Sequence, residues 1–207
     1  MKRKSTMVTP SSTSLPPMGK HHANSISPFN PVAKPGDFLW NSFDLRDDFN
    51  TIFQWQEKYY GAQAWAGDNS PAEEFRETCV LALASGLSAM HICRYREDMI
   101  CYAEIGKTST DEISLLYSQS SGDYILRLLT NPFKTFTNQV YTVMLKCCLE
   151  YIFTNKEVNR VIIEAGHHPY EQAMKQAGFR PLTTIKRRTG TTTLFYYNRS
   201  LAASVHN

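Results

Sequence analysis

Residues 123–164, DYILRLLTNPFKTFTNQVYTVMLKCCLEYIFTNKEVNRVIIE, decide the fold that this sequence predicts. They begin with a strand from Asp123 to Thr130, which is rich in isoleucine and leucine and stops at Asn131-Pro132. A short apolar strand from Val158 to Glu164 ends the segment. Between the strands, apolar side chains recur at i, i+3, i+4, i+7, i+8 and i+11, which predicts a helix with one buried face: Val140, Val143, Met144, Cys147, Cys148 and Tyr151. A strand-helix-strand unit of this kind predicts a parallel pair of strands.

The flanking segments complete a mixed sheet with helices packed on it. Before the central unit we expect a strand near Phe38, helices over 46–60 and 71–87, and a hairpin made of 89–95 and 99–105. After it we expect a short helix over 169–177 and a terminal hairpin made of 179–187 and 191–198. The order is β-α-α-β-β-β-α-β-α-β-β. The fold class is therefore α/β (α+β), with about seven strands in one sheet and about four helices.

Composition excludes several classes of protein. The 207 residues carry 22 basic and 19 acidic side chains, and this near balance argues against a protein that binds nucleic acid through phosphate neutralisation. No apolar run reaches the roughly 18 residues that a membrane span needs. The five cysteines show neither CxxC nor Cys/His ligand spacing, so neither a disulfide scaffold nor a metal site is expected. We expect a cytoplasmic protein with no nucleic-acid or membrane partner.

The composition also changes along the chain. Residues 1–37 hold six of the ten prolines and many serines and threonines, which predicts a disordered tail; a wrongly assigned start codon is the alternative explanation. We expect the folded domain over 38–200 and a short C-terminal tail over 201–207.

The order of elements resembles the GNAT acyltransferase superfamily, and individual residues resemble its siderophore-biosynthesis branch. That branch comprises the hydroxylysine acetyltransferases of aerobactin synthesis and the mycobactin acyltransferases. The resemblance rests on anchors in a fixed order: Phe43-Asp44-Leu45-Arg46, Trp65, Tyr102-Ala103-Glu104, Asp123, Glu150-Tyr151-Ile152-Phe153 and Ala177-Gly178-Phe179. It covers about residues 38–198 and implies a GNAT fold with acetyl-CoA or another acyl-CoA as co-substrate.

The resemblance places the coenzyme on the turn between the central strand and the long helix. Relatives carry glycines and arginines there, whereas this chain reads Phe136-Thr137-Asn138-Gln139-Val140-Tyr141. Side chains would crowd a pyrophosphate that glycines leave room for, so a helix start that binds nothing is the alternative. The expected coenzyme-binding residues are Leu129, Lys134, Thr135, Thr137, Asn138 and Gln139.

The catalytic assignment departs from the branch at one position. Relatives have a histidine four residues after an aspartate in the central strand, where this chain has Arg127 after Asp123. Arginine cannot act as a base at neutral pH. It can bind an anion or stabilise an oxyanion, or else pair with a nearby carboxylate. When the last expected helix is aligned with that of the relatives by counting back from Gly178, Glu164 and His167 are the candidates to accept the proton. His167 could instead only cap that helix.

The resemblance also implies a pocket for a small-molecule acceptor, lined by Trp65, Tyr102, Glu104 and Asp123. The two aromatic residues, Trp65 and Tyr102, could instead only pack in the core or at its rim. A carboxylate such as Glu104 can hold the cationic end of a lysine-like substrate, or it can form an ion pair across the strands. We expect an N-acyltransferase that acylates an amine or an N6-hydroxylysine-like hydroxylamine in siderophore biosynthesis, with enzymes of that pathway as partners. Two alternatives remain: a GNAT-fold binding module with weakened catalysis, and an acetyltransferase with a different amine acceptor.

Overall fold

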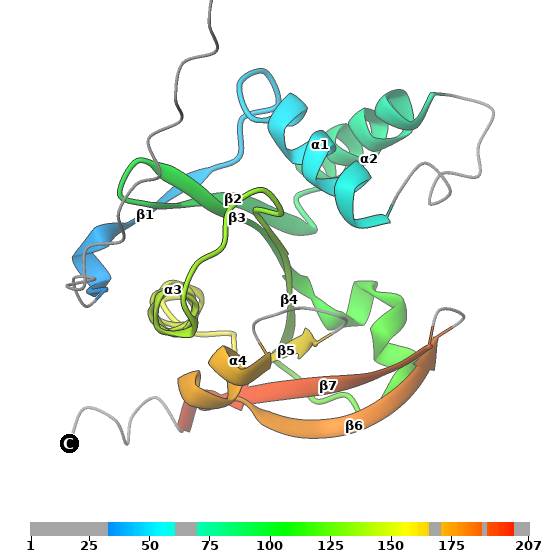
Figure 1. Cartoon of the computed structure of the whole chain (residues 1–207). Coiled ribbons are helices and arrows are strands. Elements are labelled where there is room, and N and C mark those ends of the chain that lie inside the picture. Colours follow the sequence, from blue (N-terminus) through cyan, green and yellow to red (C-terminus); the bar gives the residue numbers. More distant parts are fainter. Residues whose placement is uncertain (1–32, 61–69, 166–170, 188–189, 201–207) are drawn as a thin grey trace, which may run out of the picture. The chain divides into compact units, whose positions relative to one another are not determined.

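The computed structural model describes residues 33–60, 70–165, 171–187 and 190–200, all within one structural unit (Figure 1). A short 3-10 turn, η1 (Pro35–Asp37), precedes the first strand, and η3 (Thr108–Thr110) and η4 (Glu112–Leu116) lie between β3 and β4. The other elements in chain order are β1 (Phe38–Ser42), α1 (Phe49–Tyr60), α2 (Pro71–Ser85), β2 (Ser88–Tyr95), β3 (Asp98–Lys107), β4 (Asp123–Thr130), α3 (Asn138–Ile152), β5 (Arg160–Glu164), α4 (Glu171–Ala177), β6 (Arg180–Arg187) and β7 (Gly190–Asn198).

The strands form one mixed sheet in the order β1-β2-β3-β4-β5-β7-β6, which confirms the predicted fold class. Every neighbouring pair is antiparallel except β4 and β5, which run parallel on either side of the α3 crossover. The second crossover, through α4, adds no further parallel neighbours, because β7 lies between β5 and β6.

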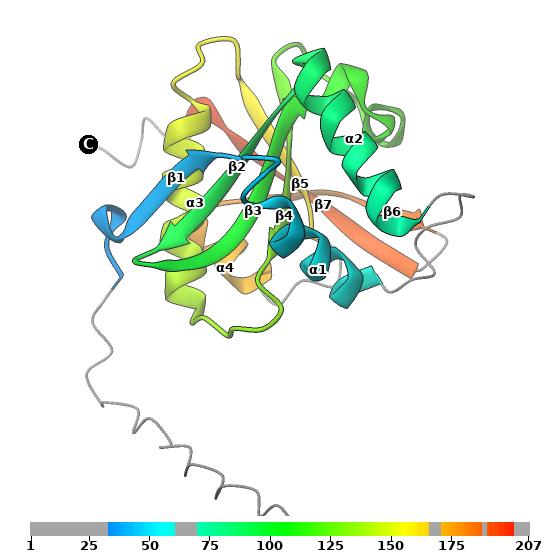
Figure 2. The same ribbon diagram turned by 90° about the horizontal axis from the view of Figure 1, so that it is seen from above.

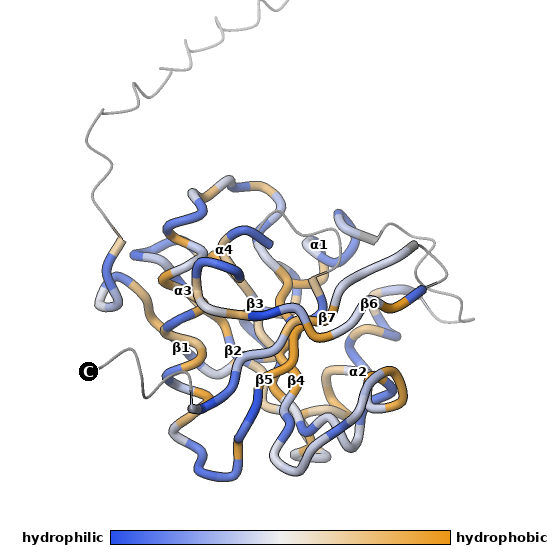
Figure 3. The backbone as a smooth tube through the Cα atoms, turned by 90° about the horizontal axis from the view of Figure 1, so that it is seen from below, coloured by the Kyte–Doolittle hydropathy of each residue, from blue (hydrophilic) through white to orange (hydrophobic). Residues whose placement is uncertain are grey.

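Helices cover both faces of the sheet. Figure 1 shows α3 and α4 on one side and α1 and α2 on the other, and Figure 2 gives the same arrangement from above. The α3 side holds the larger hydrophobic cluster, which includes Leu126, Met144 and Ile163. The α1–α2 side holds a second cluster, which includes Ile52 and Tyr102. Figure 3 shows hydrophobic residues concentrated in β4 and β5, where the sheet is covered on both faces.

The buried face of α3 is wider than the sequence pattern predicts. Val143 and Cys147 are half-buried and Tyr151 is 44% exposed, although the spacing puts all three in the buried stripe. The buried side chains are Val140, Tyr141, Met144, Leu145, Cys148, Leu149 and Ile152. The helix is in contact with β-strand residues, with α4 and with η1, so its buried arc exceeds a single stripe.

Local hydrogen bonds explain where α1 and α2 begin. The α2 helix starts after a capping box, in which the Glu73 N–H donates to the Ser70 hydroxyl (3.3 Å) and the Ser70 N–H to the Glu73 carboxylate (3.2 Å). Gly86 ends it in the left-handed conformation, at φ +62°. The α1 helix starts at Phe49 rather than at the predicted Arg46, because the Asp44 carboxylate accepts the Arg46 N–H (2.7 Å) and holds a turn ahead of the helix.

No helix in the described ranges is both long and apolar enough to cross a membrane.

Candidate functional site

The sheet opens between its two parallel strands. Pairing of β4 with β5 ends at Leu126↔Ile163, although β4 continues to Thr130. Beyond Glu164 the chain follows β7 instead, since the Ala165 N–H donates to the Thr193 carbonyl (2.9 Å). The edge of β4 from Arg127 to Thr130 therefore faces a gap, and its backbone groups can bond an extended ligand there.

Three predicted site residues lie together where the strands separate. Leu126 and Ile163 both face the α3 cluster, so the next residues, Arg127 and Glu164, both face the opposite side. Glu104 is the register partner of Arg127 on β3 and shares that side. The structure thus brings two carboxylates and one guanidinium to the same end of the gap.

Arg127 forms an ion pair with Asp111, a residue that the sequence interpretation did not consider. The carboxylate of Asp111 also accepts the Ile113 N–H (2.9 Å), so it caps η4. The side chain of Arg127 is 45% exposed and that of Asp111 only 12%. Of the two interpretations of Arg127, pairing with a carboxylate is the one seen in the structure. The segment 108–116 shows no hydrophobic periodicity. The signal that could have identified Asp111 is its position two residues before an apolar residue, where an aspartate can cap a helical turn.

Tyr102 and Leu129 lie beside these charges and are register partners across β3 and β4. Both are buried in the α1–α2 cluster, so the side chain of Leu129 belongs to the core while its backbone lies in the β4 segment at the gap. Burial raises the pKa of Tyr102 far above its ordinary value of 10; the charge of Glu104 raises it further, and Arg127 opposes this. The Tyr102 hydroxyl is therefore neutral and can donate a hydrogen bond, but it cannot act as a phenolate.

The turn from β4 to α3 holds the residues expected at the coenzyme. Thr137 caps α3 by accepting the Val140 N–H (3.4 Å), which leaves the N–H groups of Asn138 and Gln139 at the helix start without an intrahelical acceptor. The Asn138 side chain donates to Gln172 of α4 (2.8 Å). Thr135 is exposed. Lys134 is exposed too and forms an ion pair with Asp98, at the start of β3.

Hydroxyl groups gather at the end of β4. The Tyr59 and Thr130 hydroxyls are 2.9 Å apart, and Thr130 is fully buried. Tyr141, in the first turn of α3, bonds the Thr130 side chain and the Phe136 backbone. The sequence interpretation missed Tyr59 and Thr130. The only signal for Tyr59 was its position four residues after the apolar Trp55, at the end of the α1 stripe.

Asp123 lies at the other end of β4, away from the gap. Its buried carboxylate accepts hydrogen bonds from the Arg160 guanidinium (2.8 and 2.6 Å), the Tyr117 hydroxyl (2.9 Å) and the Ser120 N–H (2.9 Å). Contact of Asp123 with a substrate stays a prediction. Trp65 and His167 lie outside the described residues.

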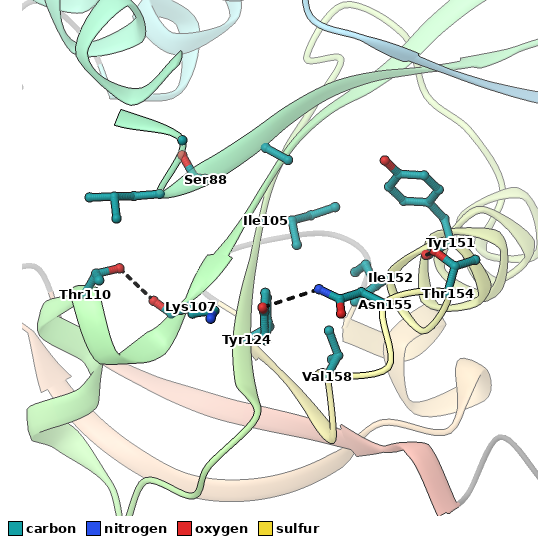
Figure 4. A pocket seen from close by; sticks show the side chains of 13 residues that line it. Ser88, Ile105, Lys107, Thr110, Tyr124, Tyr151, Ile152, Thr154, Asn155 and Val158 are labelled. Atoms are coloured by element: carbon teal, nitrogen blue, oxygen red, sulfur yellow. Dashed lines mark hydrogen bonds between the residues drawn. The ribbon is translucent and has the colours of Figure 1, made fainter. Parts of the chain in front are cut away.

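A cavity of about 450 Å³ opens at that far end of β4, between the start of β2 and the end of α3 (Figure 4). Of the predicted site residues that the structure describes, none is among those that line it. The Tyr124 hydroxyl accepts a hydrogen bond from Asn155 (3.4 Å), and Lys107 pairs with Glu157 (3.2 Å). Tyr151 lies on its α3 side, well separated in the sequence from the turn that starts the helix.

The thiols are poorly suited to carry an acyl group. Burial raises the pKa of Cys79 to about 11, and it raises the pKa of Cys148 further. The thiolate is the nucleophilic form of cysteine, so these groups are inert near neutral pH. Within the described ranges no three His, Cys, Asp or Glu side chains form a group that could hold a metal ion.

Comparisons with known proteins agree with this architecture. A family model described as an acetyltransferase (GNAT) domain matches residues 44–187. A comparison with curated protein sequences found no match.

Among solved structures, the aminoglycoside acetyltransferase AAC(6')-Ib in complex with coenzyme A superposes with a TM-score of 0.66 at 14% identity, over 82% of this chain and 99% of that one. An uncharacterized Bacillus halodurans protein, bh2621, gives 0.66 at 15% identity, over 81% and 86%. A spermidine N-acetyltransferase chimera of Vibrio cholerae SpeG and hSSAT gives 0.61 at 13% identity, over 81% and 98%. At these identities the likeness establishes the fold.

Proposed function

Because this chain belongs to the GNAT acetyltransferase family, we propose that it transfers an acyl group from acyl-coenzyme A to the amine of a small-molecule acceptor. The observation that carries the proposal is the gap between β4 and β5. Charged side chains lie at one end of its β4 edge, and the start of α3 lies at the other. Acyl-coenzyme A is an extended molecule with a thioester at one end and anionic phosphates further along. The charged side chains would lie beside the thioester, and the start of α3 would lie beside the phosphates.

The donor set fits acyl-coenzyme A. The β4 edge from Arg127 to Thr130 offers backbone groups for the amides of the pantetheine arm. We assign the phosphates to the N–H groups of Asn138 and Gln139 and to the hydroxyls of Thr135 and Thr137, with the positive charge of Lys134 nearby; the start of α3 supports this assignment. When bound, the thioester supplies an activated acyl carbon.

The residues at the gap have distinct proposed roles. Glu164, with His167, accepts the proton that the attacking nitrogen releases, a contribution of typically 10²–10⁴-fold. Glu104 holds the cationic end of the acceptor, and Tyr102 and Trp65 line its pocket. Arg127, which Asp111 holds in an ion pair and which is still 45% exposed, stabilises the oxyanion that develops on the acyl group. Since the buried thiols are inert, the acceptor attacks the thioester directly.

The acceptor we favour is a cationic amine. Of the four charged side chains that we assign to this end of the gap, Glu104, Glu164 and Asp111 are carboxylates and Arg127 is the cation, a balance that favours a positively charged acceptor. AAC(6')-Ib and SpeG, which share the fold, are named for cationic amine substrates. The second candidate is an N6-hydroxylysine-like hydroxylamine in siderophore biosynthesis, supported by the anchor residues of that branch. Enzymes of siderophore assembly would then be partners.

Two measurements test this function. Calorimetric titration with coenzyme A should show saturable binding. Release of free thiol from acetyl-CoA should then be followed with N6-hydroxylysine, lysine, spermidine and kanamycin. Turnover with any amine above the rate without acceptor supports the proposal, and preference for N6-hydroxylysine identifies the siderophore reaction. Binding without turnover would indicate a binding module, and absence of both would refute the proposal.

A further inference from the structure

Three hydroxyl groups connect helices that lie on opposite faces of the sheet. Tyr59 ends the buried stripe of α1, whose Ile52 and Trp55 pack in the α1–α2 cluster, while Tyr141 packs in the α3 cluster. Between them the Thr130 hydroxyl lies 2.9 Å from that of Tyr59 and bonds Tyr141. Helices on opposite faces can meet only where the sheet is interrupted. At Thr130 β4 is no longer paired with β5, so the sheet is interrupted there (Figure 1).

Either hydroxyl can be the donor in the bond between Tyr59 and Thr130. Tyr141 completes the group: burial raises its pKa to about 12, and hydrogen bonds with the Thr130 side chain and the Phe136 backbone lower it. A phenol can both donate and accept a hydrogen bond, so the Tyr59 side chain has the chemistry to bond an amide or a hydroxyl of a ligand.

Tyr59 lies at a defined point along the ligand path. Thr130 is three residues beyond Arg127, which places it roughly 10 Å along the strand from the charged end of the gap. The turn to α3 begins directly after it. Tyr59 is 36% exposed, whereas Thr130 is inaccessible, so of this pair Tyr59 is the residue that an incoming molecule can contact.

We propose that Tyr59 is a positioning residue for the pantetheine arm of acyl-coenzyme A, which it bonds near the phosphate end of the arm. This inference rests on the proposed function, because it presumes that the coenzyme lies along β4. The arm carries amide and hydroxyl groups between its thiol and its phosphate, and these match the acceptor and donor capacity of a phenol. Thr130 and Tyr141 orient the phenol from behind.

The experiment compares two ligands on the full chain and on Tyr59→Phe. Calorimetric titration with coenzyme A should show affinity reduced roughly 3- to 10-fold in the variant, as loss of one hydrogen bond predicts. Titration with adenosine 3′,5′-bisphosphate, which lacks the arm, should show no change. In turnover, the Michaelis constant for acetyl-CoA should rise while that for the acceptor stays constant.

Tyr151→Phe is the matched control, since it removes a tyrosine hydroxyl at the opposite end of α3 (Figure 4). It should leave both affinities unchanged. Equal loss of affinity for both ligands in Tyr59→Phe would mean a general structural effect. An unchanged affinity for coenzyme A would mean that Tyr59 does not contact it. Either result overturns the inference about Tyr59 but leaves the proposed function standing. If the unsubstituted chain binds neither ligand, the proposed function fails and the inference fails with it.

Discussion

Arg127, Glu104 and Glu164 place charges on a side of the sheet where the neighbouring β4 positions, Ile125 and Leu129, are buried and apolar. Charged groups on a strand surface between apolar neighbours carry a desolvation cost that is offset when they bind one another or a ligand. Arg127 is paired with Asp111, which offsets its charge beside the glutamates, and we assign contact with the cationic end of the acceptor to Glu104.

The two carboxylates can be separated by kinetics. Glu164→Gln should lower turnover at least tenfold, because it removes a proton acceptor. Glu104→Gln should chiefly raise the Michaelis constant of the acceptor, because it removes a binding charge. Steady-state rates with the best acceptor of the panel measure both, with Glu150→Gln on the exposed face of α3 as control. Normal turnover in Glu164→Gln would remove it from the proton path.

Asp123 should matter for stability. Asp123→Asn weakens a buried pair with Arg160, and removal of one partner of such a pair costs about 3–5 kcal/mol. Lys175→Met is the control, because it breaks the exposed pair with Glu171 on α4, worth about 0.2–0.5 kcal/mol. Urea unfolding measures both free energies. Equal losses in the two variants would contradict the structural role, and loss of acceptor binding without loss of stability would restore the substrate role.

His91 gives the free energy of unfolding a pH dependence. The side chain is 6% exposed, and burial lowers its pKa below the ordinary 6.5, although a hydrogen bond with the Asn41 backbone opposes this. Between pH 6.5 and the lower pKa of the folded state, the unfolded chain therefore binds a proton that the folded chain does not, so stability falls as the pH falls through this range. His91→Phe, which keeps a ring against Tyr151, should reduce this slope in urea unfolding measured at several pH values. An unaltered slope would exclude His91 as its source.

At the scale of elements, the helices and strands were largely predictable because their signals are local. The range predicted for β4, Asp123 to Thr130, matches the structure, and the capping residues of α2 stand in the sequence. Three features escaped prediction. Asp44 delays α1 through side-chain hydrogen bonds, and η3 and η4 lack any hydrophobic period. The buried face of α3 is also wider than the predicted stripe.

Gly122 fixes the turn that leads into β4. It has φ +81°, and a Cβ there would lie 2.5 Å from Asn159 Nδ2 and 2.6 Å from the Glu157 carbonyl. Gly122→Ala should cost about 1–3 kcal/mol through backbone strain, and more through these contacts. Gly36→Ala is the control, because a Cβ added at Gly36 would meet nothing within 4 Å. Chemical denaturation should separate the two variants, and equal stability would show that the turn adapts.

At the scale of the whole molecule, the site was harder to predict than the fold, because it depends on which strands are neighbours. Pairing of β3 with β4 sets Glu104 opposite Arg127, and the departure of β5 toward β7 opens the gap beside them. Neither follows from local pattern, and neither was predicted from the sequence. The hydroxyls of Tyr59 and Thr130 meet only through tertiary packing, so no spacing in the sequence points to them.

The start of the folded part is testable by truncation. Ala33 is buried in the α3 cluster although it falls in the predicted tail, and β1 with Phe43 precedes the matched family region. A chain that starts at Ala33 should keep its free energy of unfolding. One that starts at Asp44 should lose several kcal/mol, since burial of one large apolar side chain is worth about 1.5–3 kcal/mol. Destabilisation of the longer chain would move the boundary toward the N-terminus.

The position of β7 governs the order in which this sheet can assemble. It is the last strand along the chain, yet it lies between β5 and β6. During synthesis β1 to β4 can pair as soon as they emerge, whereas β5 and β6 have no common neighbour until β7 leaves the ribosome. Until then a nascent chain exposes an apolar β5 edge, Val161 to Ile163, that is open to wrong partners. The interval between synthesis of β5 and synthesis of β7 therefore sets how long this edge stays exposed.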